Sequence, residues 1–483
     1  MNALASNVSH ALPPGAELER LFTLQRAAFE RERYPVLATR RDRLARLMKL
    51  TADNEDRIVA AIAQDFGHRS AHETRLAECY IVASASRHAL GHLERWMKPT
   101  RVATPLHLMP GRAEIIRQPL GVVGVISPWN YPLQLALAPA IGALAAGNRV
   151  LLKPSELTPA TSTLLQQLVA QHFREDEFAV VLGDAVVGRA FSTLPWDHLF
   201  FTGSTTVGRA VARAAADNLT PVTLELGGKS PALFDEDADF ALTAPRLVSG
   251  KLLNAGQTCI APDYALVPHA RAEAFVAAVR DAAAKLYPSI AANPDYTAIV
   301  NARHHRRLVD LIDDARMKGA RIVPLGHGGE ASSESGRKLA PTLILGVSDD
   351  MAVMREEIFG PLLPVETYVG LDDAIARING RPRPLAFYYF GRDKSRRQRV
   401  LRETIAGGVT INDTIWHFAH EGLPFGGVGA SGIGAYHGER GFLTFTREKP
   451  VFHQSRFAAT KLLYPPYGRR FERVLALLKK LNG

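Results

Sequence analysis

The chain has 483 residues but only two cysteines, Cys79 and Cys259. So few cysteines cannot build a disulfide framework, which fits a reducing compartment and predicts a cytoplasmic protein. Cys79 lies in a run with helical spacing of apolar residues, so we expect it to be a buried packing residue. Cys259 instead follows Gly-Gln-Thr in a short polar loop ahead of a proline, and this setting needs another explanation.

The sequence also lacks an unbroken apolar run of the ~20 residues that a membrane span needs. Its most apolar stretch, residues 120–152, is interrupted by Ser-Pro-Trp-Asn at 127–130 and by Gly-Asn at 147–148. The first fifteen residues show neither the basic region nor the apolar region of a signal peptide. We therefore predict no membrane association and no export signal.

A basic stripe is missing too, although the formal net charge is +10. The 58 Lys and Arg residues are spread over the whole chain and are not interleaved with aromatic residues. This pattern indicates a solvated basic surface, which could help an anionic cofactor to arrive, rather than a nucleic-acid interface. We expect no nucleic-acid partner.

What the chain does contain is an alternation of short apolar runs and helical patterns. Its composition is that of an ordinary globular protein, and its length predicts two or three domains. After a helical N-terminal part, the alternation predicts a parallel α/β sheet, and its continuation beyond residue 221 predicts a second α/β unit. We expect helices at 133–146 and 160–171, and strands at 121–126, 149–153, 178–182, 198–202, 231–234, 264–267, 342–345, 385–390 and 408–411.

Two motifs directly follow predicted strands, where open α/β sheets bind ligands. In S-P-W-N-Y-P at 127–132, Asn130 is held between two prolines, so its amide could donate to a developing oxyanion. A loop-capping asparagine is the alternative. In K-P-S-E, Lys153 and Glu156 could hold ribose hydroxyls, and a surface ion pair is the alternative.

Two glycine patterns bear on phosphate binding. F-T-G-S-T-T-V-G at 201–208 joins a strand to a helix, so its backbone N–H groups could face a phosphate. It is not an NTPase loop, because Arg-Ala follows where Lys-Ser/Thr is required. G-V-G-A-S-G at 427–432 matches the dinucleotide pattern but lacks the surrounding βαβ unit, so we interpret it as a flexible or close-packed loop.

Two side chains could carry out chemistry. Glu225 lies between leucines in L-E-L-G-G-K, where an apolar setting raises the pKa of a carboxyl group and suits a general base; an outward-pointing charge on an edge strand is the alternative. Cys259 could be a nucleophile if positive charge or N–H dipoles lie nearby. No histidine or second cysteine has metal-ligand spacing around it, so we expect no metal.

Together and in this order, the motifs resemble those of the aldehyde dehydrogenase superfamily. The matching stretches span residues 128–427 and are P-W-N-Y-P, K-P-S-E, F-T-G-S, E-L-G-G-K, G-Q-T-C, E-E-I-F-G-P and P-F-G-G. The short N-terminal region and K-L-L-Y-P-P-Y are similar to the class 3 branch. Residues 424–445 resemble bacterial coniferyl aldehyde dehydrogenases.

This resemblance implies an α/β fold with a variant Rossmann cofactor domain, a second α/β catalytic domain and a small oligomerisation element. It assigns residues 1–98 and 119–223 to the NAD(P)-binding domain and residues 224–425 to the catalytic domain. Residues 99–118 and 426–483 become oligomerisation and tail elements. A homodimer is expected.

The resemblance also implies roles for single residues. Cys259 becomes the nucleophile, Glu225 the general base, and Asn130 with the Cys259 backbone N–H the oxyanion hole. The implied cofactor-binding residues are Pro128, Trp129, Lys153, Glu156, Gly203, Ser204, Gly208, Glu357 and Phe359. The candidates for the aldehyde tunnel are Tyr131, Leu135, Trp416, His417, Phe418 and His420.

The implied activity is NAD(P)-dependent oxidation of an aldehyde to a carboxylic acid through a thiohemiacetal and a thioester of Cys259. NAD is favoured over NADP, because Glu156 disfavours a 2′-phosphate. The tunnel residues suit a phenolic aromatic aldehyde such as coniferyl aldehyde, with a medium- or long-chain aliphatic aldehyde as the alternative. An acylating enzyme that uses coenzyme A is disfavoured, since Glu225 can activate water. A non-catalytic structural protein is the remote alternative.

Overall fold

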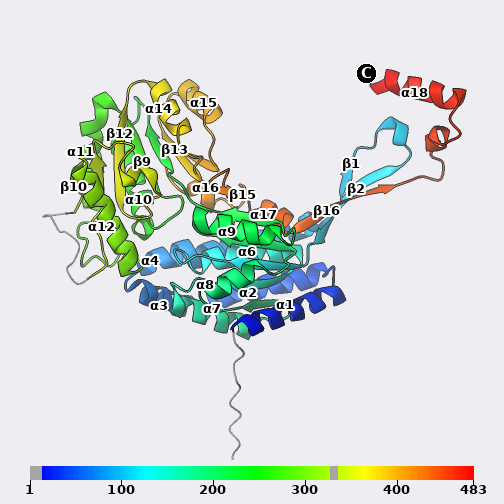
Figure 1. Cartoon of the computed structure of the whole chain (residues 1–483), viewed down its shortest axis with the longest axis horizontal. Coiled ribbons are helices and arrows are strands. Elements are labelled where there is room, and N and C mark those ends of the chain that lie inside the picture. The colour runs from blue at the N-terminus through cyan, green and yellow to red at the C-terminus, as the bar shows by residue number, and fades with distance from the viewer. Residues whose placement is uncertain (1–13, 327–335, 483) are drawn as a thin grey trace, which may run out of the picture.

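The computed structural model describes residues 14–326 and 336–482, which form sheets of six, seven and three strands. The first sheet and its helices make one lobe, the second sheet and its helices another, and the third sheet forms an arm that projects from the first lobe (Figure 1). The predicted α/β class is confirmed.

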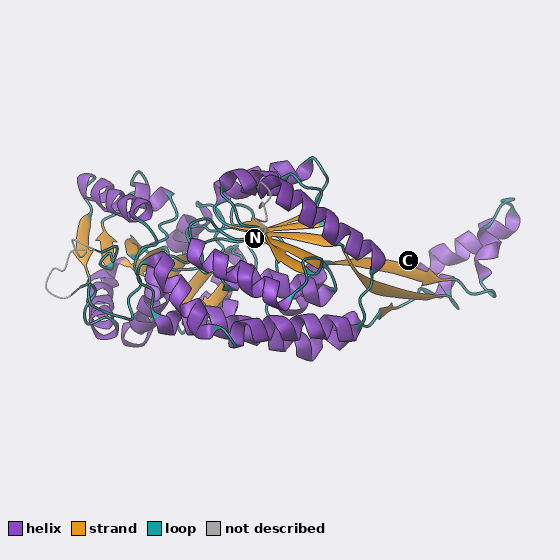
Figure 2. Cartoon of the chain, turned by 90° about the horizontal axis from the view of Figure 1, so that it is seen from below, coloured by secondary structure: helices purple, strands orange, loops and turns teal. Residues whose placement is uncertain are grey.

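The first sheet has the order β15-β7-β6-β3-β4-β5, and its neighbours are parallel except for the antiparallel edge strand β15. Helices cover both of its faces (Figure 2), which is why its strands are continuous Val, Leu and Phe runs. The strands are β3 (Val122–Ile126), β4 (Arg149–Lys153), β5 (Phe178–Val180), β6 (His198–Thr202), β7 (Val222–Glu225) and β15 (Gly432–Ile433).

The helices of the first lobe come mainly from the N-terminal half of the chain. Among them α6 is almost wholly buried, because it packs against α2, α5 and the sheet at once. The helices are α1 (Pro14–Arg31), α2 (Leu37–Ala52), α3 (Glu55–Phe66), α4 (Ala71–Thr74), the π-helix η1 (Arg75–Tyr80), α5 (Ile81–Met97), α6 (Gln134–Ala146), α7 (Pro159–His172), α8 (Ala185–Ser192), α9 (Thr205–Ala216) and α17 (Gly438–Thr444).

The second sheet has the order β10-β11-β12-β9-β8-β13-β14 and is parallel except at β10. Its strands are β8 (Pro231–Phe234), β9 (Tyr264–Pro268), β10 (Arg321–Pro324), β11 (Thr342–Leu345), β12 (Leu362–Tyr368), β13 (Ala386–Phe390) and β14 (Gly408–Ile411). Its helices are α10 (Phe240–Leu252), α11 (Ala272–Leu286), α12 (Ala302–Met317), α13 (Ala352–Arg355), α14 (Leu371–Asn379), α15 (Lys394–Glu403) and α16 (Trp416–Ala419), with the short 3₁₀ segments η3 (Leu253–Gly256) and η4 (His269–Arg271).

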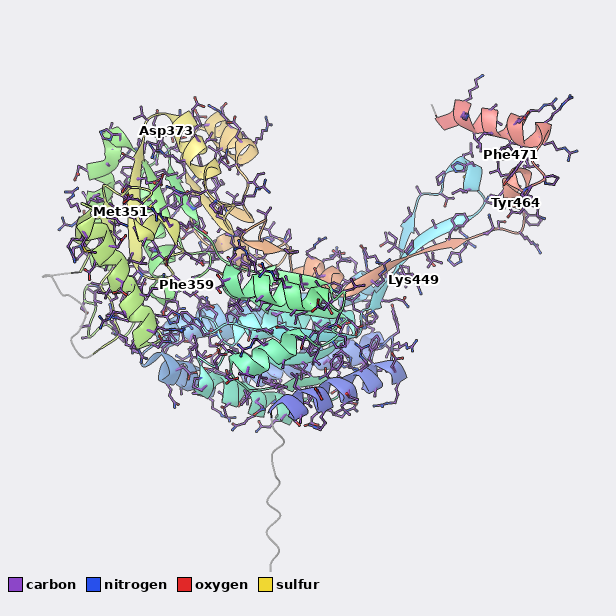
Figure 3. All side chains as sticks on the ribbon, viewed as in Figure 1. Met351, Phe359, Asp373, Lys449, Tyr464 and Phe471 are labelled. Atoms are coloured by element: carbon purple, nitrogen blue, oxygen red, sulfur yellow. The ribbon has the colours of Figure 1, made fainter. Side chains whose placement is uncertain are left out.

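The arm joins two distant parts of the chain in an antiparallel sheet of order β1-β2-β16. Lys449 lies on the arm, and Tyr464 and Phe471 lie at its far end, well away from both lobes (Figure 3). Residues 426–445 lie against the first lobe instead, through β15 and α17. The arm contains β1 (Thr100–Val102), η2 (Leu106–Leu108), β2 (Arg112–Pro119), β16 (Thr446–His453), η6 (Ala459–Leu463) and α18 (Arg469–Asn482).

Every strand predicted from the sequence overlaps an observed strand, and α6 and α7 match the two predicted helices. The glycine-rich segment 427–432 is a close-packed turn, since a Cβ at Gly427 would overlap the backbone of Ser431.

Cys79 is buried, as expected, and burial raises the pKa of its thiol to about 12. Among the described residues, no helix combines the length and the apolar character that crossing a membrane requires.

Candidate active site

Cys259 lies in a loop, here called the nucleophile loop (residues 254–260), whose start has an unusual backbone. Asn254, Ala255 and Gly256 are left-handed in succession, with φ of 53°, 51° and 75°. Such a conformation costs ~1–3 kcal/mol for each non-glycine residue and persists only where the surroundings enforce it. At Gly256 a side chain is excluded outright, because a Cβ would overlap the carbonyl oxygen of Gly360. The backbone of Gly256 therefore lies close against that of Gly360.

Buried and half-buried polar side chains enforce this backbone. The Gln257 amide nitrogen donates to the carbonyl oxygen of Asn254 (3.0 Å), and its amide oxygen accepts from the Val300 N–H (2.9 Å). The Glu73 carboxylate accepts from the Asn254 N–H (3.1 Å) and from the Thr297 hydroxyl (2.7 Å). The strained turn that precedes Cys259 is therefore fixed from two sides.

The thiol of Cys259 lies in a mixed electrostatic environment. Burial raises its pKa, and the neighbouring carboxyls of Glu357 and Glu225 raise it further. The backbone N–H groups of Cys259 and Ile260 face the sulfur and lower the pKa, but by less. The dipoles that a reactive cysteine needs are present, yet the net effect keeps the resting thiol protonated at neutral pH. The reaction therefore requires a proton acceptor.

Asn130 belongs to the turn that precedes α6 and is buried. Its Nδ2 donates to the carbonyl oxygen of Gln257 (3.1 Å), inside the nucleophile loop. An amide nitrogen carries two N–H groups, so one remains for a ligand. The backbone carbonyl oxygen of Asn130 accepts from Asn254 Nδ2 (2.9 Å) and from Arg69 Nη1 (2.9 Å). The turn and the nucleophile loop are thus hydrogen-bonded to each other.

Glu225 is the last residue of β7 and is only 2% exposed. Neither carboxyl oxygen has a hydrogen-bond partner among the described residues. Burial raises the pKa of this carboxyl well above its ordinary value. The surface-charge alternative is therefore wrong, and the apolar environment expected from the flanking leucines is confirmed.

A cavity of about 220 Å³ brings Cys259, Asn130 and Glu225 together. The other predicted residues that line it are Pro128, Trp129, Leu135, Gly203, Ser204, Glu357 and Phe359. The residues that sequence reasoning missed are Thr202, Leu226, Gly227, His304 and Arg307. Phe359 lies where the two lobes meet (Figure 3), so this cavity is built from both of them.

The chemistry of this cavity fits the ribose and ring of a nicotinamide nucleotide. Glu357 Oε1 and Thr202 Oγ1 are buried and have no hydrogen-bond partner in the described part of the chain. Gly227 leaves space for Glu357, since a Cβ there would overlap its carboxylate. Burial raises the pKa of Glu357 to about 8. The ring of Phe359 packs edge-on against Trp129, with centroids 5.3 Å apart, and forms an aromatic wall.

The remaining predicted cofactor residues lie outside the lining of this cavity. Lys153 is buried at the end of β4, and its Nζ donates to Glu156 Oε2 (3.2 Å). The Glu156 side chain is 45% exposed, so the ion pair leaves it open to a ligand. Gly208 lies within α9, against Leu226. Ser204 is the N-cap of α9, and this N-terminus opens toward the cavity through Gly203 and Ser204.

A second, mostly apolar cavity of about 470 Å³ meets the first one at Cys259 and Leu135. The predicted residues that line it are Tyr131, Leu135, Trp416, Phe418 and His420. The residues that were not predicted are Leu76, Ala77, Tyr80, Ile81, Ser84, Gln134, Leu253, Thr258, Ile260, Ile415 and Ala419.

His417 is the one predicted tunnel residue that does not line this cavity. It is buried behind the wall, where its Nδ1 lies 2.7 Å from the Thr410 hydroxyl and its ring stacks on Phe425. In the described ranges, no group of three or more His, Cys, Asp or Glu side chains could hold a metal ion.

An α/β protein in which two cavities meet at one half-buried cysteine has room for a substrate and a cofactor on either side of a nucleophile, as a cofactor-dependent enzyme requires. The chain belongs to the aldehyde dehydrogenase family, whose sequence model matches residues 14–451. It is 53% identical to a probable coniferyl aldehyde dehydrogenase of Pseudomonas aeruginosa, over 95% of each chain. Family 3 aldehyde dehydrogenases are also among its relatives, so both parts of the resemblance are confirmed.

Solved structures agree with this assignment. The substrate-bound state of Staphylococcus aureus AldH matches with a TM-score of 0.90 and 40% identity, over 95% of this chain and 99% of that one. The C302A mutant of the P. syringae indole-3-acetaldehyde dehydrogenase AldA, in complex with NAD+ and IAA, matches with a TM-score of 0.83 and 27% identity, over 91% and 89%. The aldehyde dehydrogenase-like fold class is therefore confirmed, and the reaction class is the oxidation of an aldehyde.

Proposed function

We propose that this protein oxidises an aromatic aldehyde such as coniferyl aldehyde to the carboxylic acid, with NAD as the preferred cofactor and Cys259 as the nucleophile. The observation that carries the proposal is the position of Cys259 at the meeting point of two cavities, beside Asn130 and Glu225. One cavity is apolar and suits the aldehyde. The other carries unpaired buried oxygens that suit a ribose.

The first step is addition of the Cys259 sulfur to the aldehyde carbon. The thiol gives its proton to solvent water, an S–C bond forms between the sulfur and the carbonyl carbon, and the carbonyl π electrons move to the oxygen. The free N–H of Asn130 Nδ2 and the backbone N–H of Cys259 stabilise this oxyanion. One such donor typically contributes ~10²–10³ in rate.

The second half converts the adduct into the acid. When bound, a nicotinamide nucleotide supplies the acceptor for the hydride that leaves the former aldehyde carbon. Glu357 and Thr202, which line the smaller cavity, would hold its ribose, and Phe359 its ring. The thioester that remains is hydrolysed by a water. Glu225 accepts the proton of this water as its oxygen bonds to the acyl carbon, and the S–C bond then breaks with its electron pair on the Cys259 sulfur, so that the acid departs.

The aromatic substrate class is supported by the walls of the larger cavity. Tyr80, Trp416 and Phe418 offer aromatic faces, and Ser84 and His420 add polar groups that could hydrogen-bond a phenolic hydroxyl. The relative at 53% identity is described as a probable coniferyl aldehyde dehydrogenase. A medium- or long-chain aliphatic aldehyde is the second candidate, because the cavity is mostly apolar.

An aldehyde panel tests the substrate class. We expect NADH formation with coniferyl aldehyde and benzaldehyde, and a kcat/KM for coniferyl aldehyde at least about tenfold above that for octanal, or ~1.4 kcal/mol. A higher value for octanal would establish the aliphatic alternative. Absence of NADH formation with every aldehyde would favour a non-catalytic protein. Acceleration by coenzyme A would indicate the acylating variant.

A Glu156→Gln variant tests cofactor choice. A carboxylate accepts hydrogen bonds from free ribose hydroxyls and repels a 2′-phosphate. Losing a charge-assisted hydrogen bond costs ~1.5–3 kcal/mol, and since Glu156 is half-exposed we expect the lower end, about a tenfold rise in the KM for NAD. The KM for NADP is expected to change little or to fall.

The matched control is Glu175→Gln, which removes an exposed carboxylate that pairs with Arg20; neither residue lines a cavity. It should leave both KM values unchanged. An unaltered NAD/NADP ratio in Glu156→Gln would show that Glu156 only pairs with Lys153.

We also infer a cytoplasmic homodimer with the domain division given by the family resemblance, except that residues 426–445 pack against the first lobe. Both cysteines are free thiols, which suits a reducing compartment. The far end of the arm exposes apolar side chains that include Tyr464 and Tyr467, as an unfilled subunit contact would. Light scattering after size exclusion tests the dimer, and a monomeric mass at micromolar concentration would contradict it.

A further inference from the structure

Arg69 and Glu78 form an ion pair deep inside the first lobe. Their charged groups are 3.1 Å apart, and both side chains are fully buried. Burying two charges is costly, and the desolvation penalty can exceed their mutual attraction. A pair in such a place is therefore weak evidence for stability, and its other contacts indicate what it does.

Glu78 acts on the start of α6. Its Oε2 accepts from the backbone N–H groups of Leu133 (3.0 Å) and Gln134 (2.7 Å). N–H groups at a helix N-terminus have no acceptor within the helix, so Glu78 supplies one. Glu78 therefore fixes the end of the turn that carries Asn130. It comes from η1, a π-helical segment, which is a conformation frequent at functional sites.

Arg69 acts on Asn130 directly. Its Nη1 donates to the Asn130 carbonyl oxygen (2.9 Å), which also accepts from Asn254 Nδ2 in the nucleophile loop (2.9 Å). The guanidinium lies over the ring of Tyr131, 4.8 Å from its centroid, and over that of Phe66 at 5.1 Å. The backbone of Asn130 is thus held between a buried cation and the nucleophile loop.

We propose that Arg69, held in place by Glu78, is a positioning residue that fixes the Asn130 amide beside Cys259. This inference rests on the proposed function, in which Asn130 stabilises the oxyanion. Without the pair, the Asn130 carbonyl loses a charged donor and the first turn of α6 loses its acceptor. A displacement of ~1 Å at a reacting centre can cost ~10² in rate.

The test is a set of variants, each made alone and in an Asn130→Ala background. Arg69→Met/Glu78→Gln removes both charges of the pair, so neither is left buried without the other. We expect it to lower kcat at least about tenfold with the KM for NAD within about twofold of wild type. In the Asn130→Ala background, the same pair of substitutions should change kcat by less than about twofold, because the group it positions is gone.

Arg69→Lys keeps the positive charge but not the guanidinium, and it serves as the test if the paired variant does not fold. We expect it to lower kcat by less than the paired variant does, and to have no such effect in the Asn130→Ala background. The matched control is Arg43→Met/Glu177→Gln, which removes another buried ion pair of the first lobe, outside both cavities. It should lower Tm without changing kcat.

The outcomes separate the inference from the function on which it rests. If the Arg69 variants lower kcat by the same factor in the wild-type and Asn130→Ala backgrounds, the pair does not act through Asn130 and the inference is overturned. The same holds if the Arg69 variants keep wild-type kcat while Asn130→Ala does not. If Asn130→Ala itself keeps full activity, the proposed oxyanion role is wrong. A loss of Tm with unchanged kcat would show a structural pair only.

Discussion

Aldehyde oxidation is expected to fall more than about 10³-fold when Cys259 is replaced by alanine, while dinucleotide binding persists. Cys259 and Leu135 are the two residues that line both cavities, and only Cys259 carries a nucleophilic atom, so we expect no other residue to supply the covalent step. The smaller cavity keeps Glu357, Thr202 and Phe359, which is why the cofactor should still bind. NADH formation measures the first effect, and quenching of tryptophan fluorescence by added NAD measures the second.

The matched control is the chain's other cysteine. Cys79 is buried in the first lobe, lines neither cavity, and has a thiol pKa raised to about 12, so it cannot substitute for Cys259. Cys79→Ala is expected to retain wild-type turnover. If Cys259→Ala kept a tenth or more of the activity, the nucleophile would have to be assigned elsewhere.

The sequence could predict the part of the site that depends on the sheets. Asn130 and Glu225 follow or end parallel strands of one sheet, and the carboxyl ends of such strands share an edge. Local motifs at strand ends therefore come together in space even when they are nearly a hundred residues apart. Gly256 is a local signal of another kind, because only a glycine tolerates so close an approach of another chain segment.

The walls of the larger cavity could not be predicted in the same way. Tyr80 and Ser84 come from helices of the first lobe, where their spacing reads only as an ordinary helix surface. His417 was predicted to line this cavity and does not. Helix α16 has only four residues, and its sequence does not tell which side faces the cavity. Strand β12 was missed because Pro364 interrupts its apolar run and cannot donate to the sheet.

The same limit applies to the buried charges. Glu78 lies in the helical run that also holds Cys79, and nothing in that run indicates that its carboxylate accepts from the start of α6. That contact joins residues more than fifty positions apart, and it exists only after the first lobe has packed. Local patterns identify groups that can react, while the groups that orient them are set by tertiary contacts.

The environment of Glu225 determines how the rate should depend on pH. Burial raises the pKa of its carboxyl, and only the ionised form can accept a proton from water. The base is therefore absent at low pH and appears as the pH rises through that raised pKa. Steady-state turnover of the wild-type protein should increase with pH over this range, provided that thioester hydrolysis limits the rate.

Glu225→Gln is expected to slow thioester hydrolysis ~10²–10⁴-fold while the preceding hydride transfer is retained. The amide has the same shape but no basic form, so the acyl group stays on Cys259. Rapid mixing should then show a burst of about one NADH per site, followed by a very slow phase whose rate no longer rises with pH. Hydroxylamine, which attacks thioesters without a protein base, should restore turnover. A burst reduced in the same proportion as the slow phase would place Glu225 in an earlier step.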